Sequence, residues 1–196
     1  MANNCEDELA ADIERNCDAN PIAGLESDIV IFNKKDIDPA SIVYDAANDL
    51  LVTTFSLFSG KVGYKLEGVK QSNFVGDELV IKDYSNSYSH LLGGVIVNPS
   101  VANRKTLSIL MGGDEFVAIV NKKWKGTDSL DAFAIFGLDS GLVGSTKTYK
   151  SNESDGVEVF ELKSREGYEE PKTYLTYSTG VYATDLAEFD AKFIEA

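Results

Sequence analysis

Two dense apolar runs near the middle of the chain constrain the fold most. FVAIV spans 116–120 and AFAIF spans 132–136, and a polar connection that contains the only tryptophan, Trp124, separates them. Short runs rich in Val, Ile and Phe and bounded by Gly, Asp and Lys are typical of strands with little solvent exposure. The connection is too long for a tight hairpin and has the composition of a surface loop. Residues 115–142 are therefore predicted to supply the core strands of an antiparallel β domain.

Alternation elsewhere predicts further strands. Tyr64 and Leu66 alternate with Lys65 and Glu67, which is the period of a half-buried strand. Residues 50–68 are interpreted as a β-hairpin, residues 83–89 as a loop, and His90 as a residue at the start of a strand. The other expected strands are 29–32, 78–82, 95–97, 145–150 and 157–161.

Two helices are expected. Asn98 is predicted as the N-cap of the first, with Pro99 at its first position and Gly112-Gly113 after its end. The second is predicted at the C-terminus, with Thr184 as its cap. Its apolar stripe consists of Leu186, Phe189, Phe193 and Ile194. The predicted class is α+β, mainly antiparallel β: a β-sandwich or half-barrel with a flanking helix and a C-terminal helix.

The chain is predicted to comprise an acidic N-terminal arm, residues 1–27, and a single β-rich domain, residues 28–196. The first twenty residues carry little apolar surface, so they form either a flexible terminus or an arm that orders against a partner subunit. Both cysteines, Cys5 and Cys17, lie in this arm. Without a secretory signal we expect two reduced thiols, and a disulfide between them would only close a short terminal loop.

The charge balance excludes several classes of function. The chain has 18 basic and 32 acidic residues, a formal net charge of -14. Nucleic-acid binding needs clustered Lys and Arg, so specific binding to DNA is disfavoured. No apolar run approaches the roughly 18–20 residues that span a bilayer, and the N-terminus lacks the zones of a secretory signal. We therefore expect a protein of cytosolic origin with no membrane partner.

No catalytic or metal site is predicted. Gly137–Gly141 places a serine between glycines, yet His90 is the only histidine available as a base, and nothing orients the pair. The three glycines of 137–144 lack the following helix that a phosphate loop requires. The acidic pairs Glu153/Asp155 and Glu169/Glu170 are interpreted as solvated surface. The chain is thus predicted not to be an enzyme and to need no cofactor.

Several segments together resemble one family. They are the MANNCED start, then GLESDIVIFNKKDID, VNKKWKG, DAFAIFGLDSGL, SNESDG and REGYEEP. In this order they are similar to tail proteins of tailed bacteriophages, most of all to tail tube (major tail) proteins. The resemblance implies subunits that form rings, usually hexameric, whose sheets join into a barrel around a lumen. Rings stack through terminal arms and loops, DNA passes through during ejection, and no catalytic residue is implied.

The resemblance leads to expectations about partners and sites. The protein is expected in the virion, as a homo-oligomer in contact with other tail proteins and assembled in the host cytoplasm. The expected subunit interface consists of the basic loop and the acidic arm, with residues Lys122, Lys123, Trp124, Lys125, Cys5 and Cys17. A lumen lined with carboxylates would let DNA slide without binding. The predicted lumen carboxylates are Glu67, Glu158 and Glu161, each the polar member of an alternating strand.

Two other classes of function stay open at this point. The first is another phage structural component, namely a head–tail adaptor, a tail terminator or a capsid decoration protein. The second is a small-ligand-binding domain or an enzyme, which would need a concave pocket with convergent polar groups.

Overall fold

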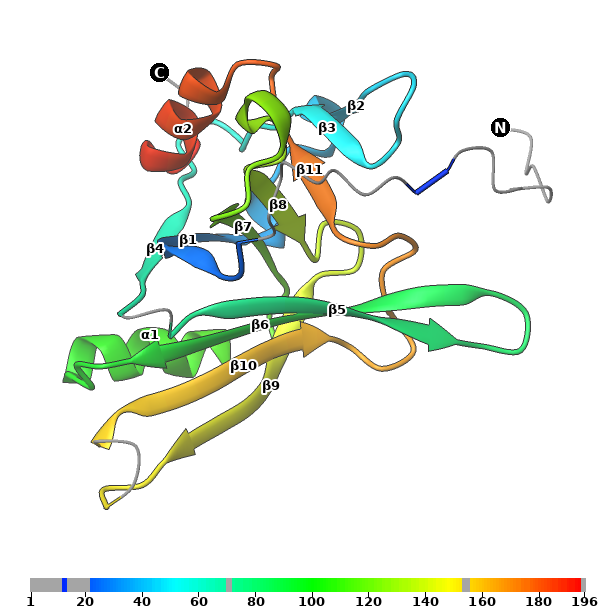
Figure 1. Cartoon of the computed structure of the whole chain (residues 1–196). Helices are drawn as coiled ribbons and strands as arrows, with labels where there is room; N and C mark the ends of the chain where they lie inside the picture. The colour runs from blue at the N-terminus through cyan, green and yellow to red at the C-terminus, as the bar shows by residue number, and fades with distance from the viewer. Residues whose placement is uncertain (1–11, 14–21, 70–71, 153–155, 195–196) are drawn as a thin grey trace.

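The computed structural model describes residues 12–13, 22–69, 72–152 and 156–194, which form two β layers with a helix beside each (Figure 1). The strands are β1 (Leu25–Asn33), β2 (Val43–Tyr44), β3 (Leu51–Thr54), β4 (Tyr64–Glu67), β5 (Phe74–Ile81), β6 (Asn86–Ile96), β7 (Phe116–Lys122), β8 (Phe133–Phe136), β9 (Leu142–Tyr149), β10 (Glu158–Ser164) and β11 (Leu175–Tyr177). The helices are α1 (Val101–Leu110) and α2 (Tyr182–Asp190), and short 3-10 turns occur at Lys34–Asp36, Pro39–Ser41 and Thr127–Ser129.

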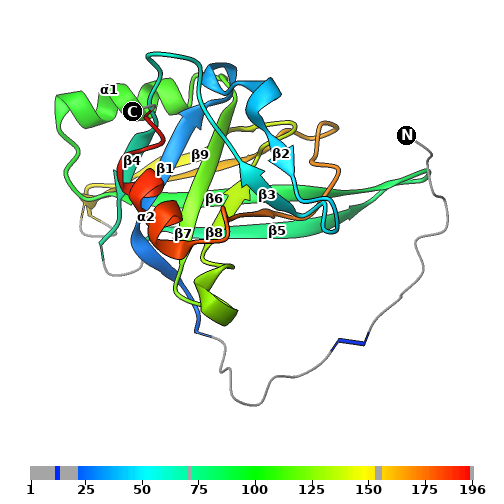
Figure 2. The same ribbon diagram turned by 90° about the horizontal axis from the view of Figure 1, so that it is seen from above.

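The strands run in one continuous order, β2-β3-β11-β8-β7-β9-β10-β6-β5, with β1 and β4 attached beside β7. All pairings are antiparallel except that of β11 with β3. A single residue pair, Phe116 with Leu142, joins β7 to β9. The sheet bends at this pair and divides into two layers (Figures 1 and 2). The first layer consists of β4, β1, β7, β8, β11, β3 and β2, and the second layer consists of β9, β10, β6 and β5. The predicted class, α+β with mainly antiparallel β structure, is confirmed.

The central strands of the first layer are buried on both faces. In β7, Val117 and Ile119 belong to one apolar cluster, whereas Ala118 and Val120 belong to another. Strands β1 and β8 divide their residues in the same way. A strand covered on both faces needs no polar alternation, which explains the continuous apolar runs in the sequence. The predicted burial of 116–120 and 132–136 is confirmed.

The first cluster lies between the first layer and α2. Three rings, Phe32, Phe55 and Phe193, pack edge to face with centroids 5.3–5.5 Å apart. Phe189 is buried in the same cluster and Leu186 packs against it, so most of the predicted stripe of the last helix is confirmed. The helix ends at Asp190, before Phe193 and Ile194, and Ile194 is 53% exposed.

The second cluster fills the space between the two layers and also receives α1. Leu107 of α1 is fully buried there beside Leu142 and Phe160. Helix α1 approaches β9 closely because position 144 is glycine. A Cβ at Gly144 would lie 2.7 Å from the Cα of Met111. The predicted packing of this helix against a sheet is confirmed.

Several predicted strand details are wrong. Residues 50–68 do not form a hairpin, because β3 pairs with β2 and β11 whereas β4 pairs with β1. Alternation identifies a strand but not its partner. Residues 86–89 are strand rather than loop, so His90 lies inside β6 and not at its start. Strand β1 begins at Leu25, three residues before the predicted domain boundary, and β11 was not predicted.

Both helix caps also differ from the prediction. Ser100, not Asn98, is the N-cap of α1, and its side chain accepts a hydrogen bond from the backbone N–H of Asn103 at 3.2 Å. Helix α2 begins at Tyr182, so Thr184 lies within it. Asp185 is buried and accepts hydrogen bonds from Ser178 and Thr179 at the preceding turn. The cap of α1 thus lies two residues after the predicted one, and the N-cap residue of α2, Val181, forms no side-chain capping hydrogen bond.

Candidate functional site

The basic loop after β7 contains the predicted interface residues that the structure describes. Its backbone is tied to the start of β1, because the N–H of Lys123 donates to the carbonyl of Gly24 at 3.1 Å. Gly126 has a φ of 68°, and a Cβ there would meet the Asp131 carboxylate, so only glycine fits this turn. Cys5 and Cys17 lie outside the described residues.

The lysines of this loop have different environments. Lys125 is neutralised: its Nζ lies 3.4 Å from a carboxylate oxygen of Glu26 and hydrogen-bonds Asn121 and Tyr182. Lys122 instead lies over two rings, with its Nζ 5.5 Å from the centroid of Trp124 and 5.2 Å from that of Tyr174. Burial lowers the pKa of Lys122, an effect that the charge of Asp131 opposes.

The three predicted lumen carboxylates do not share one surface. Glu67 is exposed on β4 and Glu161 is half-exposed on β10. Glu158 lies on the face of β10 that carries Phe160, is only 3% exposed, and pairs with Lys147 at 3.3 Å. Residues three apart on a strand point to opposite faces, so Glu158 and Glu161 cannot line the same wall. This corrects the interpretation of Glu158 as an outward-facing residue, whereas the lumen role of Glu67 and Glu161 stays a prediction.

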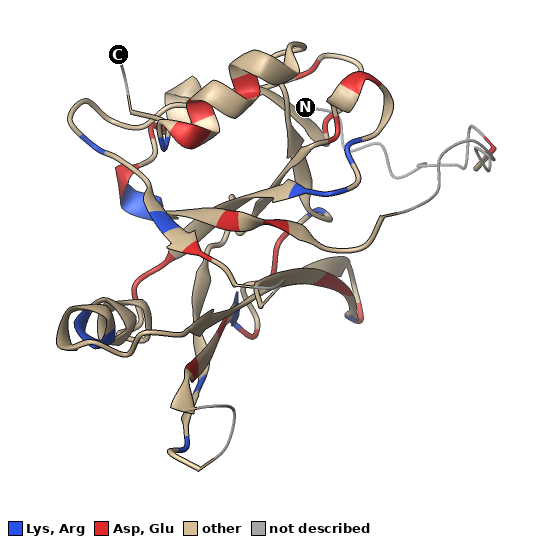
Figure 3. Cartoon of the chain, turned by 60° about the vertical axis from the view of Figure 1, so that its left-hand side comes forward, with Lys and Arg blue, Asp and Glu red and all other residues tan. Residues whose placement is uncertain are grey.

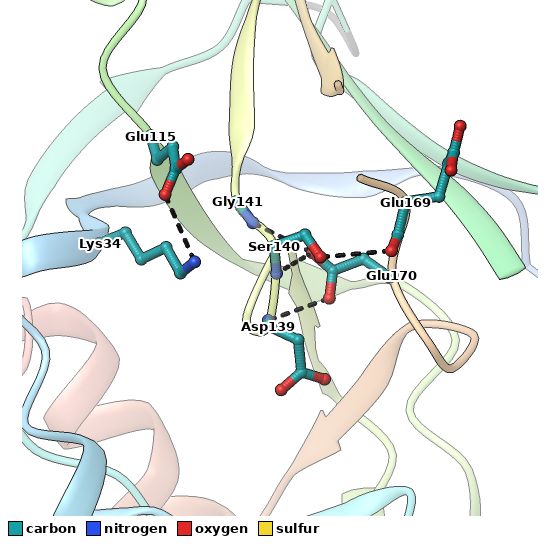
Figure 4. A network of polar contacts seen from close by, with 7 residues as sticks. All are labelled: Lys34, Glu115, Asp139, Ser140, Gly141, Glu169 and Glu170. Carbon is teal, nitrogen blue, oxygen red and sulfur yellow. Dashed lines mark hydrogen bonds and ion pairs between the residues drawn. The ribbon is translucent and has the colours of Figure 1, made fainter. Parts of the chain in front are cut away.

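The glycine-flanked serine turn is a structural clamp. The buried carboxylate of Glu170 accepts hydrogen bonds from the backbone N–H groups of Asp139, Ser140 and Gly141 at 2.9, 2.8 and 3.1 Å (Figure 4). Burial raises the pKa of Glu170, and these three bonds oppose the rise. The Ser140 hydroxyl donates to the carbonyl of Glu169 at 3.2 Å. Glu170 is therefore not solvated surface, and the turn and the acidic pair hold each other in place.

His90 stabilises the same turn after β8. It is 2% exposed, and its Nδ1 accepts the backbone N–H of Gly137 at 3.0 Å. Burial lowers its pKa to about 4. With the Nδ1 of His90 occupied and the Ser140 hydroxyl bonded elsewhere, these two residues do not form a nucleophile–base pair. Of the other acidic pair, Glu153 and Asp155 lie outside the described residues.

Strands β5 and β6 form a long hairpin that projects beyond both layers (Figures 1 and 2). Its turn-side half is anchored, because Tyr88, which lies opposite Leu79, exchanges backbone hydrogen bonds of 2.8 and 2.9 Å with Glu170. Towards the tip, Leu79 and Ile81 are 53% and 79% exposed. They share a face with His90 and Leu92 through the register of the pair, so the core-facing side of the hairpin continues past the core.

The outer edge of β5 has no strand partner in the described part of the chain. Exposed edges in monomeric proteins usually carry Lys, Pro or a bulge that blocks further pairing. The eight residues of β5, FVGDELVI, contain neither Lys nor Pro and their register with β6 is unbroken, but Asp77 and Glu78 place two charges in the strand. An unpaired edge beside exposed apolar side chains on a projecting hairpin is the feature of the described residues best suited to contact another protein chain.

No group of three or more metal-ligating side chains is found in the described ranges. No described helix is long and apolar enough to cross a membrane. Comparisons with protein-family models, with curated proteins and with solved structures each find no match to this chain.

Proposed function

We propose that the protein is a structural subunit of a bacteriophage tail, most like a tail tube protein. Copies assemble into stacked hexameric rings around a lumen that conducts DNA. On this proposal the protein resides in the virion, contacts other tail proteins, and is assembled in the host cytoplasm. The observation that carries the proposal is the unpaired β5 edge, together with the exposed Leu79 and Ile81 on the projecting hairpin.

An unpaired strand edge favours assembly, because each such edge would be paired with a neighbouring copy in a closed ring. A neighbouring copy that pairs with β5 would satisfy its backbone groups and cover its apolar side chains. The opposite end of the sheet order is β2, an edge of only two residues, and β4 is a further short edge. Two different edges that meet head to tail generate a ring when the rotation closes.

The charge supports a conduit for DNA rather than a DNA-binding protein. Acidic residues occur in both layers, whereas Lys and Arg are fewer (Figure 3). Each subunit adds a formal charge of -14 to a ring. Carboxylates on a lumen wall would repel phosphates and allow DNA to slide. The same charge makes copies repel one another, an effect that salt screens beyond about 8–10 Å.

The test is the assembly state of the purified protein. Size-exclusion chromatography with light scattering and negative-stain microscopy should show rings or tubes with a central hole, and added salt should promote them. Closed rings that never stack would favour a tail terminator or a head–tail adaptor. A monodisperse monomer at high concentration under every salt condition would overturn the proposal.

A further inference from the structure

An open hollow of about 540 Å³ lies between the two layers, at the margin of the second apolar cluster. Its lining comes from the start of β1, the first half of β5, the end of β7 with the basic loop, the end of β8 and the segment just before β11. Sites for small molecules usually have volumes of roughly 300–1,000 Å³. The hollow is therefore large enough for an organic ligand of one or two rings.

Three aromatic residues, Trp124, Phe136 and Tyr174, form what we call the aromatic wall of the hollow. Phe136 is buried, and Tyr174 stacks on it with the ring centroids 5.4 Å apart and an angle of 22° between the planes. Trp124 is 38% exposed, so part of its ring is accessible from the open side. Because Phe136 and Tyr174 already hold each other, a flat apolar ligand can be buried there at a small cost in side-chain freedom.

Lys122 supplies a cation to the same hollow. Its Nζ lies 5.5 Å from the ring centroid of Trp124 and 5.2 Å from that of Tyr174. Among the residues that the structure describes, Lys122 forms no ion pair within 4 Å, in contrast to Lys125, which pairs with Glu26. Ring faces attract an ammonium group but carry no net negative charge. A carboxylate that enters from the open side would give Lys122 the charge-assisted hydrogen bond that it lacks.

The neighbouring carboxylates leave this position open. Asp77, on the β5 side of the hollow, accepts a hydrogen bond from the Thr173 hydroxyl. The charge of Asp131 raises the pKa of Lys122 against the effect of burial, yet the two groups form no ion pair within 4 Å. Neither carboxylate is therefore a direct partner of the Lys122 ammonium. The hollow combines an apolar wall with one cation, which is complementary to an apolar ring that carries a carboxylate.

We propose that this hollow binds a small aromatic carboxylic acid. The ring of the ligand packs against the aromatic wall, and its carboxylate pairs with the Nζ of Lys122. The site belongs to the single subunit and does not depend on ring formation. Binding is therefore measured at a salt and protein concentration at which light scattering shows a single subunit. A protein that never assembles would overturn the tail-tube proposal and leave this test unaffected.

The single tryptophan makes the measurement specific to the site, because it gives one indole N–H signal in an NMR spectrum of the labelled protein. The probes are 2-naphthylacetate and its neutral amide, 2-naphthylacetamide, which have the same ring and nearly the same shape. At pH 7, 2-naphthylacetate should shift the indole signal to saturation and bind about ten-fold more tightly than the amide. Equal affinities of the two probes, or an indole signal that does not move, would overturn the proposal.

Variants of the loop test the assigned cation. Lys122→Met keeps the apolar stem and removes the charge, so affinity for 2-naphthylacetate should fall about ten-fold while affinity for the amide stays the same. Lys122→Arg should retain the preference for the acid. Lys123→Met, the same change of charge at the next residue and outside the lining of the hollow, is the control and should bind like the wild type. An equal loss in both methionine variants would mean that the acid responds to the general charge of the loop, which contradicts the pairing with Lys122.

Trp124→Leu tests the aromatic wall. This change should weaken the binding of both probes by the same factor, because both bury the same ring. Saturation-transfer NMR, which observes the ligand, replaces the lost indole signal in this variant, and circular dichroism checks that it is folded. Unchanged affinities for both probes would show that the ligand lies elsewhere, and the site would then be wrong.

Discussion

The Oε1 atom of Glu170 accepts the backbone N–H of Ser140 at 2.8 Å, across thirty residues of sequence. This bond joins the turn after β8 to the segment that pairs with Tyr88, in the turn-side half of the β5–β6 hairpin. The glycine-flanked serine turn and the acidic pair Glu169/Glu170, which resemble catalytic motifs in the sequence, thereby form one structural unit. It contacts the hairpin at Tyr88, which lies opposite Leu79, so the clamp is connected to the proposed assembly surface.

Glu170→Gln should destabilise the fold without unfolding it. An amide retains one acceptor oxygen but replaces the other with a donor, so at least one of the three buried N–H groups loses its partner. The expected loss is about 1–3 kcal/mol in the free energy of unfolding, measured by urea denaturation. Glu166→Gln, at an exposed position on the same segment, is the control and should change stability little. Equal stabilities of the two variants would show that the clamp contributes nothing.

The buried His90 should make stability depend on pH. Its pKa is about 4 in the folded protein against 6.5 for the ordinary group. As pH falls from 6.5 towards 4, the unfolded state binds a proton that the folded state does not, so stability falls. The loss is on the order of 3 kcal/mol across this window. Urea denaturation of the wild type and of His90→Gln at several pH values isolates the contribution of His90 to the free energy of unfolding, because all other groups titrate in both proteins. Parallel pH profiles would contradict the assigned protonation state.

The sequence predicted the class of the fold because burial leaves a local pattern. The runs 116–120 and 132–136 are covered on both faces, and Phe189 of α2, followed by Phe193, is buried against the first layer. Strand partners could not be predicted in the same way. Strand β3 pairs with β11, which lies more than one hundred residues away, and nothing in its alternation identifies that partner.

The candidate site was only partly predictable for a related reason. The cluster of Lys122, Lys123 and Lys125 is visible in the sequence, whereas the ring of Tyr174 that holds Lys122 comes from a distant segment. The spacing of Glu158 and Glu161 could have shown from the sequence that they do not line one wall, since residues three apart on a strand point to opposite faces. The projecting hairpin was missed because DYSNSYS has loop composition, although part of it pairs with β5.

Gly144→Ala should displace α1 from β9. The new methyl group would lie 2.7 Å from the Cα of Met111 and 3.0 Å from the carbonyl oxygen of Leu110. Overpacking of this kind costs about 1–3 kcal/mol. Gly76→Ala is a matched control, because a Cβ there meets no atom within 4 Å. Thermal unfolding should show a lower Tm for the first variant only, and an equal loss in both would contradict the close approach.

Phe133→Ala should cost about 2–5 kcal/mol in the free energy of unfolding, because the ring is fully buried between the first layer and α2. Val101→Ala, a truncation at a 75% exposed position of α1, should cost less than about 0.5 kcal/mol. Urea denaturation measures both. A negligible loss for Phe133→Ala would remove β8 from the core.

Ile81→Lys should block assembly while leaving the subunit folded. The side chain is 79% exposed on the strand whose outer edge is unpaired, so a charge there faces solvent in the monomer but would be buried against a neighbouring copy. Thermal stability should stay within about 0.5 kcal/mol of the wild type. Light scattering and negative-stain microscopy should show monomers in salt conditions under which the wild type forms rings. Ile109→Lys, at a 52% exposed position on α1, is the control and should assemble normally. Normal rings from Ile81→Lys would mean that the hairpin is not the contact between copies, even if the protein forms a tube through another surface.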